Sequence, residues 1–300
     1  MNNKKLSVTI GIPAYNEEKN IARLLKSLLR QNISNYIFNN IVVICDGCND
    51  ATSVEVRKVK SKFIRLIEGK TNKGKIARLN QLFRLNKSDL LIVFDADIGL
   101  ANDFVIYNIV KAFQRGNVSI VAGKDLPYPP DNLFGKVICS WTDVWNKIRW
   151  QLREGDNVHN LHGSIFAATN KFTKSVYIPP EVVIDDQFLY LIAKKKGFRF
   201  GFASSAIIYY KTPSSVRDYI TQSSRYLALK SFMVTYFGKD ILEEYKVPLK
   251  IKFESLVVHF LRNPLYLSFS IAWQVYLRMF NKSLTEKFAG NIWVSITSTK

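Results

Sequence analysis

Four apolar segments of strand length alternate with helical patterns in the first third of the chain, and this alternation restricts the fold more than any other feature. The segments expected as strands are residues 7–12, 40–46, 63–68 and 90–95. The segments with apolar residues at helical spacing are 17–30, 51–60 and 76–85. Such alternation is typical of an open, mostly parallel α/β sheet that binds ligands at the carboxyl ends of its strands.

The fourth apolar segment ends in two acidic residues. Residues 90–97 read LLIVFDAD, so Asp95 and Asp97 follow a fully apolar run and are expected to share one face of the strand. Two carboxylates on one face repel each other unless a divalent cation or another positive group lies between them. The pattern therefore indicates metal-assisted handling of phosphates.

The composition indicates a folded, basic protein. The 300 residues are 47% hydrophobic, which suffices for one large domain or one domain with a C-terminal appendage. The net charge of +19 indicates an acidic partner, such as nucleic acid, anionic lipid or a phosphorylated substrate. The excess of positive charge is largest late in the chain, because 17 Lys/Arg and only 6 Asp/Glu follow residue 190.

The cysteines and the N-terminal segment indicate a cytosolic protein. Three cysteines give no disulfide framework, which suits a reducing compartment. Cys45 and Cys48 form a CxxC, but without a second pair or a nearby His this is weak support for zinc. We expect no signal peptide, because the N-terminal apolar stretch is short and is broken by Gly11 and Pro13.

The later part of the chain has a less regular pattern. The expected elements are a strand at 118–122, helices at 141–152 and 184–196, and one long strand or a strand pair at 198–210. We place a catalytic domain at residues 1–236 and a basic, aromatic, helical segment at 237–300. In the latter, the longest charge-free stretch is 263–277, shorter than the ~20 residues of a spanning helix. We therefore expect the segment to lie in a membrane interface, with packing on the catalytic domain or on a second protomer as the alternative.

Three other classes of protein explain fewer of these sequence features. Residues 69–75 read GKTNKGK, which has the spacing of a P-loop NTPase, but Ile76 stands where Ser or Thr must bind magnesium. No G-x-G-x-x-G occurs for a dinucleotide. A basic nucleic-acid-binding protein would explain the charge, but it leaves the acids at strand ends unexplained.

Several short motifs follow one another along the chain. They are SVTIGIPAYNEE at 7–18, DGCNDAT at 46–52, NKGK at 72–75, DAD at 95–97, DDQFL at 185–189 and QSSRY at 222–226. Their order resembles that of the inverting family 2 glycosyltransferases, and the resemblance runs from about residue 7 to residue 229. It implies the GT-A fold, a mostly parallel central sheet flanked by helices, here with a C-terminal helical appendage.

The resemblance also implies a binding site for a nucleotide-diphosphate sugar, with a family-level preference for UDP. The residues that would flank the nucleotide are Pro13, Ala14, Tyr15 and Glu17. Asp46 would contact the base, with Cys45 in place of the family's first acid, and Lys75 and Arg225 would lie near the diphosphate.

The acidic motifs carry the implied chemistry. Asp97 would bind Mg²⁺ or Mn²⁺, which acts as a Lewis acid on the leaving diphosphate, and Asp95 would lie near the ribose or a metal-bound water. Asp186 would be the base that takes the proton from the acceptor hydroxyl, an effect that contributes roughly 10²- to 10⁴-fold. Asp185 stands where the family has Glu. An acidic helix N-terminus also has a purely structural explanation in the helix dipole.

The remaining motif residues belong to the expected acceptor side. Gln222 and Tyr226 resemble a QxxRW box in which Tyr replaces Trp. His162 and Gly163 fall at the family's acceptor-side glycine segment, and a structural role for His162 remains open. The sequence thus predicts an inverting transferase that acts on a glycan or lipid-linked acceptor in cell-envelope glycan synthesis. We expect it in the cytoplasm, peripheral on the inner face of the cell membrane, with no nucleic-acid partner.

Overall fold

The computed structural model describes residues 5–182 and 184–280, with the side chains of 224–231, 278 and 280 left out. The strands are β1 (Leu6–Ala14), β2 (Tyr36–Asp46), β3 (Ile64–Gly69), β4 (Leu90–Phe94), β5 (Gly99–Leu100), β6 (Ile120–Pro127), β7 (Ile165–Thr169) and β8 (Phe200–Tyr210). The α-helices are α1 (Ile21–Leu29), α2 (Thr52–Lys58), α3 (Lys75–Leu85), α4 (Val105–Arg115), α5 (Leu133–Gln151), α6 (Asn170–Ser175), α7 (Asp185–Lys195), α8 (Val216–Phe237), α9 (Leu249–Arg262) and α10 (Pro264–Phe280).

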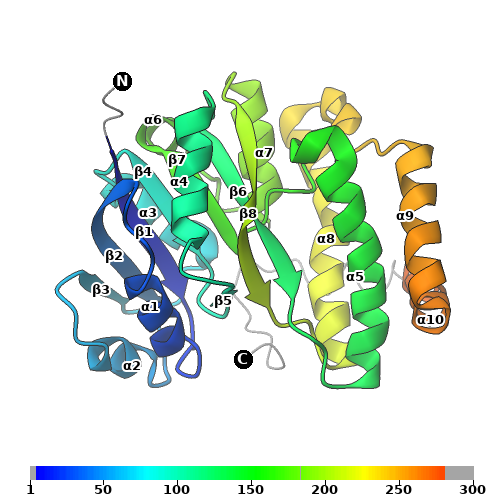
Figure 1. Ribbon diagram of the computed structural model, residues 1–300, viewed down its shortest axis with the longest axis horizontal. Helices are drawn as coiled ribbons and strands as arrows, with labels where there is room; N and C mark the ends of the chain where they lie inside the picture. Colours follow the sequence, from blue (N-terminus) through cyan, green and yellow to red (C-terminus); the bar gives the residue numbers. More distant parts are fainter. Residues whose placement is uncertain (1–4, 183, 281–300) are drawn as a thin grey trace.

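The strands form one sheet in the order β3-β2-β1-β4-β7-β6-β8-β5. The first four predicted strands are mutually parallel, and β6 runs parallel to β8. Strand β7 lies antiparallel between β4 and β6 and joins the two parallel parts. The predicted mixed α/β architecture with a mostly parallel sheet is confirmed, and Figure 1 shows helices on both sides of the sheet.

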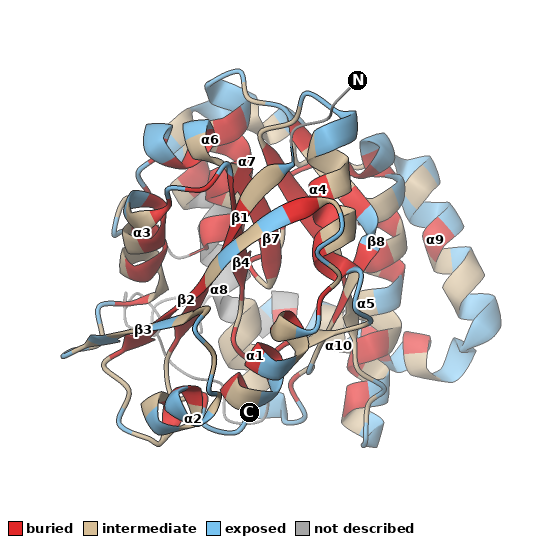
Figure 2. Cartoon of the chain, turned by 60° about the vertical axis from the view of Figure 1, so that its left-hand side comes forward, coloured by how far each residue is buried: buried red, intermediate tan, exposed pale blue. Residues whose placement is uncertain are grey.

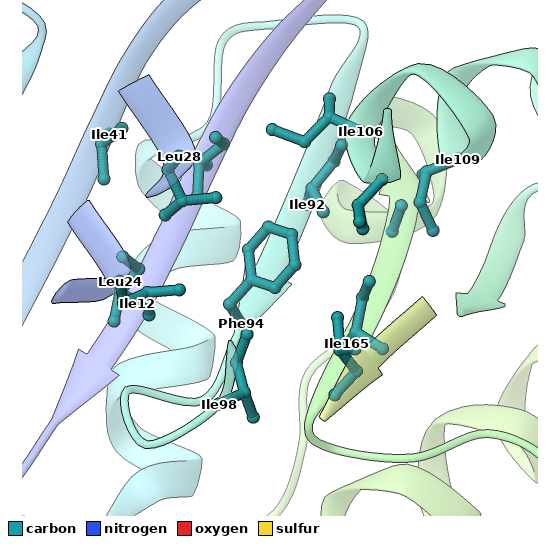
Figure 3. Close-up of a cluster of buried hydrophobic side chains, with 14 of the residues drawn as sticks. Ile12, Leu24, Leu28, Ile41, Ile92, Phe94, Ile98, Ile106, Ile109 and Ile165 are labelled. Atoms are coloured by element: carbon teal, nitrogen blue, oxygen red, sulfur yellow. The ribbon is translucent and has the colours of Figure 1, made fainter. Parts of the chain in front are cut away.

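Helices cover both faces of the sheet, which explains why its central strands are apolar without alternation. In β4, Ile92 and Phe94 face α1 and α4, whereas Leu91 and Val93 pack on the opposite side with α3 and α7. Figure 3 shows the first of these clusters, in which Phe94 lies among side chains from β1, α1 and α4. This packing fixes the carboxyl end of β4, where the acidic motif begins.

Several sequence-based expectations need correction. Strand β4 ends at Phe94, so Asp95 and Asp97 lie in the following turn and do not share a strand face. The pairing with the segment before β7 extends one residue past the strand end, because the Asp95 N–H donates to the carbonyl of Ser164, 3.2 Å away. Strand β2 begins four residues earlier than predicted, and helix α5 starts at Leu133 instead of 141. Helix α4 and strand β7 were not predicted.

The C-terminal helices α9 and α10 lie at the end of the molecule remote from β2 and β3 (Figure 1). Both pack against α5, where Val144 and Ile148 meet Leu267 in a separate small apolar cluster. None of the helices in residues 5–182 and 184–280 is long and apolar enough to cross a membrane.

Candidate active site

The predicted donor residues lie at the carboxyl ends of β1 and β2. Pro13 and Ala14 are the last residues of β1, and the Cys48 thiol donates to the Ala14 carbonyl at 3.5 Å. The Glu17 N–H donates to the Thr52 hydroxyl at 2.7 Å, which ties the loop after β1 to the start of α2. Glu17 is buried and accepts a hydrogen bond from Asn20, whereas Tyr15 is half-exposed.

Asp46 has a different environment from the one expected. Its side chain is fully buried and accepts hydrogen bonds from the N–H groups of Lys73 and Gly74, at 2.9 and 2.8 Å, and from Nε of Arg78 at 2.5 Å. The carboxylate therefore faces the loop before α3, and no surface remains from which it could contact a base. These bonds also contradict the P-loop alternative, because a P-loop needs such N–H groups for phosphate.

Lys75 links two motifs that are far apart in the chain. It is the first residue of α3, after Gly74 with a φ of +87°, and its ammonium lies 2.7 Å from Asp95 Oδ1 and 3.7 Å from Asp185 Oδ2. Burial alone would lower the pKa of Lys75, but Asp185 and Asp95 outweigh it and hold the pKa above its usual value. The ammonium therefore stays charged and joins the DAD turn to the start of α7.

The carboxylates around Lys75 are only partly neutralised. Burial raises the pKa of Asp95 to about 6, and the charge of Asp97 adds to the effect although Lys75 opposes it. Burial and the adjacent Asp185 raise the pKa of Asp186 to about 7. Asp185 Oδ2 is buried and accepts no hydrogen bond. This part of the site is short of positive charge and of hydrogen-bond donors, and a cation coordinated by the carboxylates would compensate for both.

The chemistry of these donors suits a hard divalent cation, since only carboxylate oxygens are involved. Among the described residues, no three His, Cys, Asp or Glu side chains are grouped so as to hold a metal by themselves. Mg²⁺ is usually bound in proteins through one or two carboxylates together with substrate phosphates. The acidic turn at Asp95–Asp97 fits that kind of site, in which the substrate completes the ligand set.

The loop at residues 162–164 contacts both acidic motifs. Its Gly163 lies beside Lys75 and the Asp185 carboxylate, and its Ser164 carbonyl accepts the bond from the Asp95 N–H. A Cβ on Gly163 would lie 2.7 Å from Lys75 Nζ and 3.4 Å from Asp185 Oδ2. A side chain at this position would therefore displace the Lys75 ammonium, whereas the Asp185 carboxylate would stay at ordinary contact distance.

His162 belongs to a buried charged network that the sequence did not reveal. Its Nδ1 lies 3.3 Å from Asp125 Oδ2, and the other oxygen of Asp125 accepts a hydrogen bond from Arg149 Nη2 at 2.7 Å. Burial alone would raise the pKa of Asp125, but Arg149 and His162 hold it below its ordinary value. Burial, reinforced by Arg149, lowers the pKa of His162 to about 4, so its imidazole is neutral. The pair Asp125–Arg149 thereby orients the residue next to Gly163.

The last motif lies on α8. Gln222 is half-buried there, whereas the side chains of Arg225 and Tyr226 lie outside the described residues. Helix α8 packs on the sheet through Met233, which is fully buried with the residues of α7. The placement of Arg225 at a diphosphate and of Tyr226 at an acceptor stays a prediction.

A sequence profile described as "Glycosyl transferase family 2" matches residues 9–174. Because this match covers more than half of the chain, the protein belongs to glycosyl transferase family 2. The matched segment contains the donor-side loops, Lys75, the DAD turn and the loop at 162–164.

Individual relatives agree with the fold. The mannosyltransferase PcManGT of Pyrobaculum calidifontis, solved with GDP-Man and Mn²⁺, is 19% identical with a TM-score of 0.61, over 96% of this chain and 80% of that chain. Glucosyl-3-phosphoglycerate synthase of Mycobacterium tuberculosis was solved with Mn²⁺, UDP and glucosyl-3-phosphoglycerate. It is 12% identical with a TM-score of 0.53, and the match covers 78% of this chain and 80% of that chain. The chain has the GT-A fold of these enzymes.

A curated relative matches over a shorter region. The beta-monoglucosyldiacylglycerol synthase of Nostoc sp. is 30% identical over 145 residues, which are 46% of this chain and 31% of that protein. The chain therefore spans about a third of that relative's length. The name of the relative describes the synthesis of a glucosylated diacylglycerol.

Proposed function

We propose that the protein transfers a sugar from a nucleotide diphosphate, a UDP-sugar, to an acceptor hydroxyl with inversion at the anomeric carbon. The observation that carries this proposal is the contact of Lys75 with both Asp95 and Asp185. It brings the DAD turn beside the first turn of α7, so donor-side and acceptor-side carboxylates share one small buried region. Membership of the family supports glycosyl transfer as the reaction.

The nucleotide would lie over the carboxyl ends of β1 and β2. Pro13, Ala14 and Tyr15 would flank it, with Glu17 holding the loop through its bond to Thr52. Asp46 would act as a positioning residue, because it accepts the hydrogen bond from the Gly74 N–H and so orders the loop that ends at Lys75. Asp97 would hold Mg²⁺ or Mn²⁺, which supplies Lewis-acid stabilisation of the leaving diphosphate, and Arg225 would bind a diphosphate oxygen.

Asp186 would act as the general base. Its carboxylate takes the proton from the acceptor hydroxyl as the oxygen attacks the anomeric carbon, while the bond to the diphosphate breaks on the opposite face. A pKa of about 7 suits this task, because a base works best when its pKa lies near the operating pH. The Gln187 N–H donates to this carboxylate at 2.6 Å and keeps it oriented.

The acceptor would enter beside the loop at 162–164 and α8. Its binding residues in this proposal are His162, Gly163, Asp185, Gln222 and Tyr226. We propose a glycan or lipid-linked acceptor, supported by the lipid-directed name of the Nostoc relative. An enzyme of this kind would work in cell-envelope glycan synthesis, in the cytoplasm and peripheral on the inner face of the membrane.

The test is Asp186→Asn with donor binding and transfer measured separately. We expect transfer to be abolished, while calorimetric binding of UDP with Mn²⁺ stays near the wild-type value, because the base does not contact the nucleotide. Asp103→Asn, an exposed residue before α4, is the control and should keep full activity. If Asp186→Asn turned over at the wild-type rate, Asp186 would not be the general base.

A further inference from the structure

Helix α9 has its apolar side turned to the outside. Leu249, Phe253, Val257 and Leu261 recur every four residues and form one stripe, and all four are exposed, Leu249 by 80% and Leu261 by 77%. Figure 2 shows α9 at the edge of the molecule with exposed residues along its outer side. A helix on the surface of a soluble protein normally turns such a stripe toward the core.

Helix α10 repeats the arrangement. Its outward residues include Leu265, Phe269, Tyr276 and Met279, with Phe269 exposed by 60% and Met279 by 74%. These positions also follow helical spacing, so a single side of α10 is apolar and exposed. Single exposed apolar residues are common on protein surfaces, but the stripes of α9 and α10 are continuous rows of such residues, which ordinary surfaces lack.

The buried sides of the two helices contain small polar residues. Ser255 of α9 and Ser270 of α10 are fully buried, and neither hydroxyl oxygen has a hydrogen-bond partner. Small residues at helix contacts and large apolar residues outside are the pattern of helices surrounded by lipid. Small polar residues on the buried side and large apolar residues on the outer side indicate that the outer side of these helices contacts something other than water.

The charges beside the stripes distinguish lipid from other occupants. Between residues 246 and 280 there are five Lys or Arg and one acidic residue, Glu254. Lys250, Lys252 and Arg262 are exposed on α9. A two-fold dimer through this surface would bring the same basic groups of two copies together, which is unfavourable. An anionic membrane instead attracts them while its acyl chains take up the stripes.

We propose that the outer sides of α9 and α10 are a docking surface for an anionic lipid membrane. The helices lie flat in the interface, since no helix in the described part of the chain is long and apolar enough to span. Both pack on α5, which also carries Arg149 of the network that orients His162. The docking surface is therefore joined through one helix to the proposed acceptor side. Only this last link depends on the proposed function.

Vesicle flotation of the full chain tests the proposal. Phosphatidylcholine vesicles with or without phosphatidylglycerol are used, at low and high salt. We expect binding that requires the anionic lipid. The double variant Phe253→Glu/Leu261→Glu should reduce partitioning by at least about tenfold, because two inserted side chains become charged. Ile33→Glu, at an exposed apolar residue between α1 and β2, should bind like the wild type.

Three results would overturn the proposal. The first is wild-type protein that does not float with anionic vesicles, and the second is equal loss of binding in Phe253→Glu/Leu261→Glu and Ile33→Glu. The third is a wild-type dimer that the α9 variant converts to monomer, since the surface would then bind a second copy. Asp186→Asn should bind vesicles as the wild type does, so failure of docking is distinguishable from failure of the proposed chemistry.

Discussion

Replacement of Asp46 by Asn tests whether this residue orders the Lys75 loop or reads the base. The carboxylate is fully buried and pairs with Arg78, whose side chain is 9% exposed. Removing one partner of a buried ion pair costs about 3–5 kcal/mol, because the other charge stays buried. Arg78 keeps bonds to Gln81 and to the Thr71 carbonyl, so we expect the lower end, about 3 kcal/mol.

Urea unfolding measures this loss as a change in the free energy of unfolding. Adding Arg78→Met should recover part of it, because the double variant no longer buries an unpaired charge. Glu68→Gln, which breaks the exposed ion pair with Arg57, is the control and should cost no more than about 1 kcal/mol. If Asp46→Asn leaves the stability within about 1 kcal/mol of the wild type but changes the preference among UDP, GDP and CDP, the positioning role is refuted.

Three further predictions concern the same region. Gly163→Ala should lower kcat about tenfold or more without unfolding, as measured by steady-state assay and circular dichroism, because its Cβ would force the Lys75 ammonium from Asp95. Asp125→Asn should lower the free energy of unfolding by about 3–5 kcal/mol in urea, because Arg149 would be buried without its partner; a loss below about 1 kcal/mol would contradict this. The kcat should rise with pH through about 7 as Asp186 loses its proton, whereas a flat profile would exclude it as the base. Since its folded pKa is raised, the contribution of Asp186 to stability is full below its unfolded pKa and is lost as pH rises through about 7.

The parallel part of the sheet and the place of the DAD motif at the carboxyl end of β4 were predictable from local patterns, whereas the turn that contains the motif was not. A buried strand such as β4 requires apolar residues on both faces, and the acidic residues begin where that requirement ends. The motif order also led to the correct family and fold. Helix α4 was missed because no element was predicted between the strands at 90–95 and 118–122, where this helix lies.

Contacts between distant segments were not predictable in the same way. Strand β7 is five residues long and finds its place only by pairing antiparallel with β4 and β6. The partnership of Asp125 with Arg149 joins β6 to α5 across the fold, and nothing in either segment marks it. Asp46 was expected at the base because its motif resembles that of the family, but an acid at a strand end can point either to the ligand or under a neighbouring loop. Its direction depends on Arg78, which the motif does not include.

The most direct test of the account is calorimetric titration of nucleotide diphosphates into the wild type and Asp97→Ala, with Mn²⁺, Mg²⁺ or EDTA. The account predicts that UDP binds in the presence of a divalent metal, and that EDTA or Asp97→Ala abolishes the heat of binding. Absence of binding for UDP, GDP, ADP and CDP under all these conditions would contradict the assignment of this site to a nucleotide-sugar transferase.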